Sequence, residues 1–394
     1  MKILIQKFGG TSVSTPERRA IVISKVVSAR ENGFNPIVVV SAMGRRNDPY
    51  STDTLLSLVG GPDTSLNKRD LDILMCCGEL ISTAVMAQEF SSRGYKAMAL
   101  TGGNAGIITD DNYGSAAILK VNGDKLKSLL SQDIIPIVAG FQGVTAEGDL
   151  TTIGRGGSDV TASVLGSALK AECVETYTDV DGVMTADPRI VPDAQLIDQI
   201  SYNVAFQLAD EGAKVVHPRA VEYAMRSGVP LVVKNIMSNS KGTIVSSDNL
   251  ILTRPLTAIT SLKGRTQFTI KTENWSYEKD ALTLLSENSI SIDLINIFPD
   301  KDIFTVDSMD SDKTEEILRS VSAEYKVLKG CSKISIHDTS MRGVPGFMAK
   351  ILKALSNGGI KVLQTADSHS TIWCLVSEKD SDKAVQLLHK AFVK

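Results

Sequence analysis

The chain has 394 residues, of which 43% are hydrophobic and 22% charged, and a formal net charge of -3. This length accommodates one large domain plus one or two small ones, each with its own core. The slight acidity and an aromatic content of 5% argue against a nucleic-acid partner, because phosphate binding needs clustered Lys and Arg and base stacking needs aromatic rings.

The five cysteines carry no metal-binding or disulfide spacing. Cys76 and Cys77 are adjacent and the other three are isolated, so the sequence lacks a CxxC pair, and we expect neither structural zinc, nor a disulfide framework, nor any other resident metal. No apolar run reaches the roughly 18 residues that span a bilayer, and the first residues lack the pattern of a signal peptide. We therefore expect a cytoplasmic protein without a membrane partner.

From residue 1 to about 245, short apolar runs alternate with amphipathic helical stretches such as 17–32 and 159–171. This alternation is typical of an α/β domain with a mainly parallel sheet. The apolar runs lie at 2–8, 36–42, 96–102, 134–141, 173–179 and 229–235. Because open α/β sheets bind ligands outside the carboxyl ends of their strands, we expect the functional residues at those ends.

The first apolar run ends in KFGGTSV, residues 7–13. Glycines let backbone amides approach an anion closely, and a neighbouring lysine supplies a compensating charge. Phosphate binding is therefore one interpretation, and a simple turn with a solvated Lys7 is the other. The spacing differs from GxxxxGK[ST], which excludes an ordinary P-loop.

A second glycine-rich stretch, TTIGRGGSD at 151–159, precedes a predicted helix. The first amides of a helix have no intrahelical acceptor and form a ready anion site, and Arg155 adds a planar group suited to a carboxylate or phosphate. Ser158 and Asp159 also fit plain helix capping. Capping alone does not explain the RGG that precedes them.

A third stretch, YTDVDGVMTADPR at 177–189, follows a predicted strand with three carboxylates and an arginine in one loop. Such a loop suits a magnesium nucleotide, because Mg2+ prefers one or two carboxylates plus phosphates and waters. The same residues are also good turn formers, so both interpretations stand at this point.

Two shorter stretches add candidates. Glu79 lies in the apolar LDILMCCGELIS, where an unpaired carboxylate is costly to bury; a salt bridge or an exposed helix end is the alternative. In GAKVVHPRAVEYA, Lys214 is a candidate phosphate ligand. We expect His217 to be structural, since Pro218 after it fits the first turn of a helix.

A polar, turn-rich segment at 238–249 predicts a linker. Beyond it, two units follow in tandem, and each alternates strand, helix, strand, strand, helix. A tandem pair of small α+β modules explains this pattern better than one irregular tail.

Together these stretches resemble the aspartokinases, members of the amino acid kinase superfamily. The resemblance rests on KFGGTSV, VVSAMG, CGE, TTIGRGGSD, TDVDGVMTADPR and GAKVVHP, in the order of the family, between residues 7 and 218. It implies an α/β amino acid kinase fold over 1–245, followed by two βαββαβ ACT domains over 256–394. The first ACT unit, about 265–325, is expected to be inserted into the second, which combines 256–264 with 330–394.

The resemblance implies that MgATP phosphorylates the side-chain carboxylate of L-aspartate to 4-phospho-L-aspartate, the first step toward lysine, diaminopimelate, threonine and methionine. The carboxylate is already ionised at neutral pH, so no general base is needed. Catalysis then rests on positioning and on neutralising charge between two anions.

The resemblance also implies the roles of individual residues. Lys7, Arg155 and Asp159 are the expected catalytic residues, and Ser41, Glu79, Arg155 and Asp159 the expected substrate ligands, with Glu79 on the ammonium and Arg155 on the α-carboxylate. The expected nucleotide ligands are Lys7, Phe8, Gly9, Gly10, Gly156, Gly157, Ser158, Thr178, Asp179, Met184, Asp187, Arg189 and Lys214.

In this family, ACT units pair between chains and bind an amino-acid effector, so a homodimer and feedback by lysine, diaminopimelate or threonine are expected. The first unit departs from the family's effector pattern: it has TENWSYEKDA where the second has a Pro-Gly loop, and LINIF around Asn296. The resemblance therefore does not single out one effector.

Two other functions compete with this one. The first is a kinase of another carboxylate, such as glutamate or an N-acetylated amino acid. An acylated amine carries no charge and would not need Glu79 as a partner, and the pair CGE and GRGGSD favours aspartate. A non-catalytic amino-acid sensor is the other alternative, but it predicts the loss of Lys7, Arg155 or Asp159, and all three are present.

Overall fold

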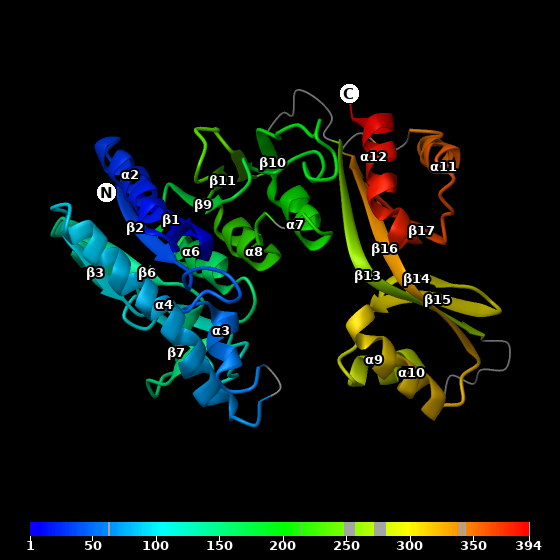
Figure 1. Ribbon diagram of the computed structural model, residues 1–394, viewed down its shortest axis with the longest axis horizontal. Coiled ribbons are helices and arrows are strands. Elements are labelled where there is room, and N and C mark those ends of the chain that lie inside the picture. The colour runs from blue at the N-terminus through cyan, green and yellow to red at the C-terminus, as the bar shows by residue number, and fades with distance from the viewer. Residues whose placement is uncertain are drawn as a thin grey trace. The chain divides into compact units, whose positions relative to one another are not determined.

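The structure is a computed structural model that describes residues 1–61, 64–213, 215–247, 257–271, 281–338, 341 and 344–393. The chain forms two compact units. The N-terminal unit comprises 1–183, 196–210 and the described part of 214–250, and the C-terminal unit comprises 184–195, 211–213 and the described part of 251–394 (Figure 1).

The N-terminal unit is built on an eight-stranded sheet with the order β10-β12-β11-β9-β1-β2-β6-β3. Its strands are β1 (Ile3–Phe8), β2 (Asn35–Val40), β3 (Ala97–Leu100), β6 (Ile135–Ala139), β9 (Cys173–Thr178), β10 (Gln199–Ser201), β11 (Leu231–Asn235) and β12 (Thr243–Ser246). Every pair is parallel except β11 with β12. This confirms the mainly parallel sheet, whose central strands are apolar because helices cover both faces.

The helices of this unit are α1 (Gly10–Val13), α2 (Pro16–Glu31), α3 (Thr52–Ser57), α4 (Lys68–Ser91), α5 (Asp124–Ser131), α6 (Gly157–Leu169), α7 (Tyr202–Asp210) and α8 (Pro218–Ser227). Side chains alternate between the faces of a strand. Phe8 packs with Val22 of α2 and Met86 of α4, whereas Ile5 and Val174 lie beneath Gly166 of α6. Lys7 therefore shares the α6 face of the sheet.

A small four-stranded sheet, with the order β5-β4-β7-β8, leads into α6. Its strands are β4 (Ile107–Thr109), β5 (Ile118–Val121), β7 (Gln142–Val144) and β8 (Leu150–Thr152). The sequence analysis did not predict this sheet.

The prediction of a linker over 238–249 was wrong for part of that segment. Residues 243–246 form β12, which pairs with both β10 and β11. Val245 is buried while Ile244 faces outward, so the two-residue alternation of a strand is present within a polar segment. Residues 248 and 249 lie outside the described part of the chain.

The C-terminal unit contains a six-stranded antiparallel sheet with the order β14-β15-β13-β16-β18-β17. Its strands are β13 (Thr257–Lys271), β14 (Asp293–Ile297), β15 (Lys301–Asp307), β16 (Tyr325–Asp338), β17 (Gln364–Asp367) and β18 (Thr371–Ser377). Its helices are α9 (Ala281–Glu287), α10 (Ser311–Ser320), α11 (Phe347–Asn357) and α12 (Ser381–Phe392), with the short 3-10 helices η2 (Ser308–Asp310) and η3 (Glu378–Asp380).

The long strands β13 and β16 are each shared by two βαββαβ halves. Thr257 of β13 pairs opposite Asp338 of β16, and Ile270 pairs opposite Tyr325. The second part of β13 pairs with β15, and the second part of β16 pairs with β18. Each half has its own apolar core, one around Phe268 and one centred on residues such as Ile334. The ACT-type α+β fold is thereby confirmed.

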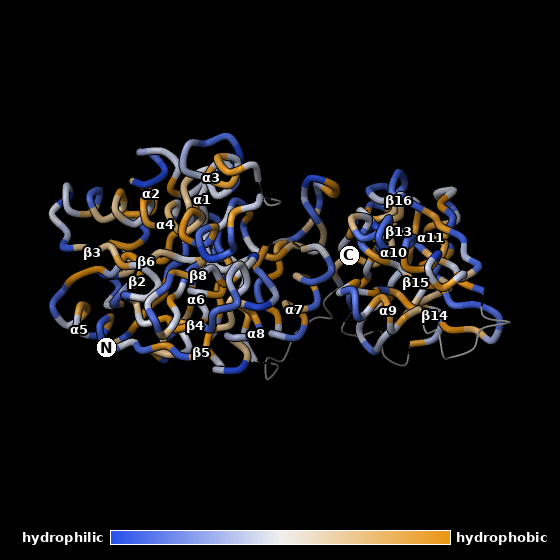
Figure 2. Tube along the Cα trace, turned by 90° about the horizontal axis from the view of Figure 1, so that it is seen from below, coloured by the Kyte–Doolittle hydropathy of each residue, from blue (hydrophilic) through white to orange (hydrophobic). Residues whose placement is uncertain are grey.

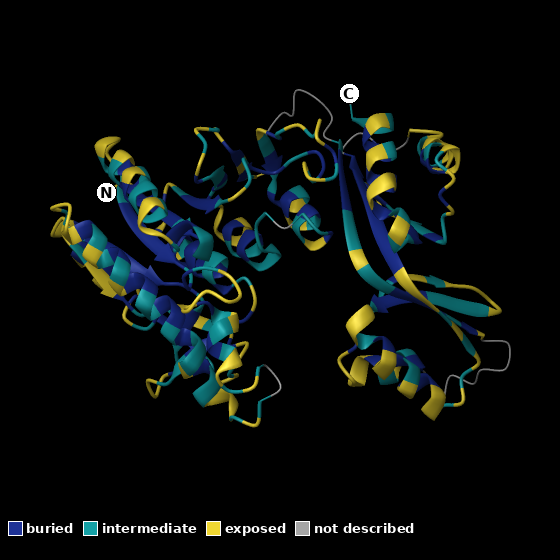
Figure 3. Cartoon of the chain, in the orientation of Figure 1, coloured by how far each residue is buried: buried dark blue, intermediate teal, exposed yellow. Residues whose placement is uncertain are grey.

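Burial follows this architecture. Figure 3 shows β1, β2 and much of β13 and β16 in dark blue, and Figure 2 shows apolar stretches alternating with polar ones in both units. Within the described ranges, no helix combines the length and apolar character needed to cross a bilayer.

Candidate active site

A cavity of about 320 Å³ opens in the N-terminal unit where β1 and β2 end and α6 begins. Eight of the predicted site residues line it together: Lys7, Gly10, Ser41, Glu79, Gly156, Gly157, Ser158 and Asp159. The carboxyl ends of the strands, where we expected the functional residues, thus border a cavity lined by many of them.

Lys7 provides the positive pole of the cavity. It extends from β1 toward α6, and its Nζ lies 2.7 Å from Oδ1 of Asp159. Asp159 sits in the first turn of α6, where the helix N-terminus favours a negative charge. Both side chains are largely buried, at 12% and 17% exposure, so an anion that enters here meets a cation with little competing water.

The turn that follows Lys7 packs so tightly at Gly10 that only glycine fits at that position. A Cβ on Gly10 would lie 2.3 Å from the carbonyl oxygen of Ala42, and the Gly44 amide donates to the Gly10 carbonyl at 3.0 Å. On Gly9, by contrast, a Cβ would meet only Nζ of Lys7, at 3.9 Å. The turn after β1 is therefore pressed against the turn after β2, and the space in front of Lys7 stays open.

The N-terminus of α6 forms the opposite wall. Gly156 is its N-cap, with φ 72°, and a Cβ there would lie 2.1 Å from the ring of His217. A Cβ on Gly157 would lie 2.6 Å from the ring of Phe141, which itself has φ 69°. Non-glycine residues rarely adopt this left-handed backbone, and such outliers cluster at functional sites. The glycines bring the N-terminus of α6 to the cavity. The Gly157 and Asp159 amides already donate to the Gly154 and Gly156 carbonyls, each at 3.0 Å, so the helix end acts there mainly through its dipole.

Glu79 of α4 provides the negative pole. It is 3% exposed, its Oε1 accepts from the Ala42 amide at 3.0 Å, and its Oε2 has no partner among the described residues. Burial raises the pKa of this carboxyl group to about 8. A buried acceptor left without a donor requires an explanation, and a cationic ligand group in the cavity supplies one.

Other predicted residues lie elsewhere. The Phe8 side chain is fully buried and stacks on Tyr177 at 4.8 Å, because it points to the face opposite Lys7. This side chain cannot touch a ligand in the cavity, so the prediction of a nucleotide ligand fails for its ring. Arg155 is exposed at the loop before Gly156, outside the cavity lining.

The end of β9 reaches the cavity through an ion pair. Thr178 donates to Asp179 at 3.2 Å, and Asp179 pairs at 3.1 Å with Arg45, which lines the cavity. These two predicted nucleotide ligands therefore border the site through Arg45.

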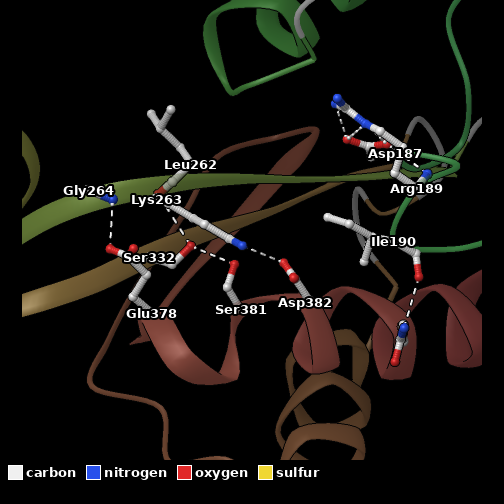
Figure 4. Close-up of polar contacts among 11 residues, drawn as sticks. Asp187, Arg189, Ile190, Leu262, Lys263, Gly264, Ser332, Glu378, Ser381 and Asp382 are labelled. Atoms are coloured by element: carbon white, nitrogen blue, oxygen red, sulfur yellow. Dashed lines mark hydrogen bonds and ion pairs between the residues drawn. The ribbon is translucent and has the colours of Figure 1, made fainter.

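The predicted nucleotide ligands Met184, Asp187 and Arg189 belong to the C-terminal unit. Arg189 pairs with Asp187 at 2.6 Å, as Figure 4 shows. For these residues a nucleotide role stays a prediction from the sequence. Lys214 lies outside the described residues. His217 caps α8 by accepting from the Arg219 amide at 3.3 Å, and burial lowers its pKa.

Several residues that line the cavity were not among the predicted ligands: Gly44, Arg45, Ser51, Thr52, Asp53 and Phe141. Ser51 is the N-cap of α3 and accepts from Thr54, so a capping pattern was available as a signal for a helix start. Nothing in the sequence connected that start with the cavity. Within the described ranges, no cluster of three or more His, Cys, Asp or Glu side chains is arranged to hold a metal ion.

Comparison with known proteins identifies families for both units. Residues 2–235 match the profile described as the amino acid kinase family, and residues 326–390 match an ACT domain. Aspartokinase 1 of Bacillus subtilis (strain 168) is 42% identical over 400 residues, which cover 100% of this chain and 99% of that protein.

Two solved structures share the fold over the whole chain. Escherichia coli aspartokinase III in complex with aspartate and ADP (R-state) has a TM-score of 0.85 at 24% identity, and the match covers 100% of both chains. The same enzyme in complex with lysine and aspartate (T-state) has a TM-score of 0.77 at 25% identity, again over 100% of both chains. With a full-length relative at 42% identity, the chain belongs to the aspartokinases within the amino acid kinase family, and it is an aspartate kinase with a C-terminal ACT domain.

Proposed function

We propose that this aspartate kinase transfers the γ-phosphoryl group of MgATP to the side-chain carboxylate of L-aspartate and so forms 4-phospho-L-aspartate and ADP. The observation that carries the proposal is the unpartnered, buried Oε2 of Glu79 in the same cavity as Lys7. The cavity has a negative pole for an ammonium group and a positive pole for phosphate. An amino acid with an acidic side chain and a nucleotide need that combination.

The chemistry follows from these poles. A side-chain oxygen of aspartate bonds to the γ-phosphorus while the bond from that phosphorus to the ADP oxygen breaks, and its electron pair leaves with ADP. No proton moves, because the attacking carboxylate is already ionised. Two anions must meet, so we assign to Lys7 and to the dipole at the N-terminus of α6 the task of neutralising the transferring group. Asp159 holds Lys7 at 2.7 Å and orients its charge.

The remaining substrate contacts extend the same logic. Glu79 receives the α-ammonium of aspartate, Arg155 binds its α-carboxylate, and Ser41 adds a hydroxyl at the end of β2. Thr178 and Asp179 border the nucleotide side through Arg45. Mg2+ enters with ATP as part of the substrate. The phosphates of ATP, water molecules and a carboxylate of the loop at 177–189 would hold it. A related enzyme solved with aspartate and ADP supports this choice of ligands.

We also propose that the chain is feedback-regulated in the synthesis of lysine, diaminopimelate, threonine and methionine, and that it forms a homodimer through its ACT domains. The domains are proposed to span 1–245 and 256–394, with the first ACT unit (about 265–325) inserted into the second. Support comes from the ACT match and from the related enzyme solved with lysine and aspartate. An effector acts only through its differential affinity for two states.

The test is ATP-dependent formation of an acyl phosphate, trapped with hydroxylamine. The substrates are aspartate, glutamate and N-acetylglutamate, each with and without lysine, diaminopimelate and threonine. Of the three substrates, we expect only aspartate to give an acyl phosphate, and we expect at least one of the three amino acids to suppress its formation. Product from N-acetylglutamate would contradict the role of Glu79, and no product from any substrate would favour the amino-acid sensor.

A further inference from the structure

One face of α4 connects the small sheet with the cavity. Arg69, Asp72, Cys76 and Glu79 recur every three or four residues and so lie on one side of the helix. Arg69 pairs with Asp149 at 2.5 Å, the Cys76 carbonyl accepts from β7, and Glu79 reaches the cavity. The helix that carries the proposed ammonium ligand is therefore fixed along this face to β7 and β8.

Asp72 is a fully buried carboxylate on this face, at 0% exposure. Its Oδ2 accepts from the Thr152 amide at 2.7 Å and the Gly114 amide at 3.0 Å, and its Oδ1 accepts from the Thr152 hydroxyl at 2.8 Å. A buried carboxylate is costly unless it is hydrogen-bonded, and charge-assisted bonds of this kind are strong and directional. Asp72 therefore sets the position of α4 on β8.

The two elements joined by Asp72 lead to the two proposed ends of the amino-acid substrate. Glu79 follows Asp72 by two helical turns, about 10 Å along α4. Thr152 ends β8, and three residues later comes Arg155, just before the start of α6. The helix that carries Glu79 and the loop that carries Arg155 are therefore both anchored at the carboxylate of Asp72.

We propose that Asp72 is a positioning residue that fixes the separation between Glu79 and the loop of Arg155, and so determines selectivity for aspartate. The proposal rests on the proposed substrate contacts. The ammonium and α-carboxylate of an amino acid share one carbon, so their separation is fixed. A shift of α4 relative to β8 would move Glu79 and Arg155 away from the ammonium and the α-carboxylate of aspartate and would misalign the side-chain carboxylate of aspartate. The binding of ATP does not depend on the separation of Glu79 and Arg155.

The rest of the loop is held independently of α4. The Ile153 carbonyl accepts from Arg219 of α8 at 2.7 Å, and within the small sheet the hydroxyls of Thr109 and Thr151 lie 2.7 Å apart. Removing the Asp72 carboxylate therefore loosens the α4 side of the loop and leaves its α8 side and its sheet intact.

The test compares Asp72→Asn with Thr151→Val in the full chain. Asparagine turns an NH2 group toward amide donors, so we expect the KM for aspartate to rise about tenfold and the preference for aspartate over glutamate to fall, with the KM for ATP unchanged. Thr151→Val removes an equally buried hydroxyl from the same strand without touching α4. It should lower the melting temperature and leave the KM for aspartate unchanged.

Thr152→Val keeps the backbone amide bond to Asp72 and removes only the hydroxyl bond. It should raise the KM for aspartate in the same direction by a smaller factor, and it carries the test if Asp72→Asn does not fold. Equal KM values for aspartate in Thr152→Val, Thr151→Val and wild type would overturn the proposal. Wild-type activity on aspartate is measured in parallel, so failure of the proposed function is seen separately.

Discussion

The two units differ in how they pair their buried charges. In the N-terminal unit, Lys7 contacts Asp159 at 2.7 Å, while Oε2 of Glu79 has no partner among the described residues. In the C-terminal unit, Lys333 is 6% exposed and lies 2.8 Å from Glu211 and 2.6 Å from Asp293. The first cluster leaves an acceptor open to the cavity.

The second cluster satisfies its carboxylates from within the chain. Besides Lys333, Glu211 accepts from the Ser335 hydroxyl at 2.7 Å and from Nε1 of Trp373 at 2.9 Å. Asp293 accepts from the amide of the next residue at 2.9 Å. Burial alone therefore does not identify a ligand site. An unsatisfied buried charge beside a cavity indicates a ligand, whereas a saturated one indicates structure.

The largest expected effect tests the open cluster. Lys7→Ala should lower kcat about 1,000-fold, as expected for the loss of a group that stabilises transition-state charge. It should also lower the melting temperature, because Asp159 loses its cation. The measurement is hydroxylamine-trapped acyl phosphate at saturating aspartate and ATP. Lys25→Ala is the control, because Lys25 donates to the Ser238 carbonyl at 3.3 Å and is not part of the cavity lining. A loss of kcat below tenfold in Lys7→Ala would remove Lys7 from catalysis.

The saturated cluster should respond through stability. Lys333→Met leaves the buried Glu211 and the partly buried Asp293 without their cation and should lower the free energy of unfolding by about 3 kcal/mol, measured by urea denaturation. Lys329 is a matched control, since it also lies on β16 and pairs with two carboxylates, Asp312 and Glu315, but is 54% exposed. Water screens exposed pairs. If Lys329→Met and Lys333→Met were equally destabilising, the distinction between the clusters would be lost.

The smallest effect is a pH dependence. Burial raises the pKa of Glu79 to about 8, and only its ionised form attracts an ammonium. In the wild type, kcat/KM for aspartate should rise about tenfold per pH unit up to that pKa and then level off. Glu79→Gln should remove this rise and leave the KM for ATP unchanged. If kcat/KM for aspartate still rose with pH in Glu79→Gln, the titrating group would be a residue other than Glu79.

The same shift fixes the sign of a stability change. Because the folded state raises the pKa of Glu79 from 4.5 to about 8, it binds the proton more tightly than the unfolded chain does. This contribution to stability is complete below pH 4.5 and is lost as the pH rises toward 8. Saturating aspartate should reduce the loss, because its ammonium favours the ionised form.

Much of the fold follows from local pattern. The apolar runs at 2–8, 36–42 and 173–179 became the adjacent strands β1, β2 and β9, since continuous apolar runs are typical of buried parallel strands. The run at 229–235 contains β11. The small sheet was missed because β4, β7 and β8 have three residues each, too few to show an alternation.

The site was predictable where one chain segment supplies both the turn and the chemistry, as with Lys7 and the loop before α6. The parts of the cavity lining that come from segments distant in the sequence, such as those of Ser51 and Phe141, were not predictable. The opposite directions of Lys7 and Phe8 follow from the two-residue period of a strand, so this error was avoidable. Asp187 and Arg189 pair with each other, which no motif indicated.

The shared strands β13 and β16 have a consequence for how the C-terminal unit unfolds. Since both strands run through the two βαββαβ halves, neither half has a complete hydrogen-bond ladder without the other. Cutting the chain after β16 would expose Cys331 through His337, which pair with β18, as an unprotected sheet edge prone to aggregation. The two halves therefore form one cooperative folding unit, and amide protons along both strands should exchange at a common, global rate.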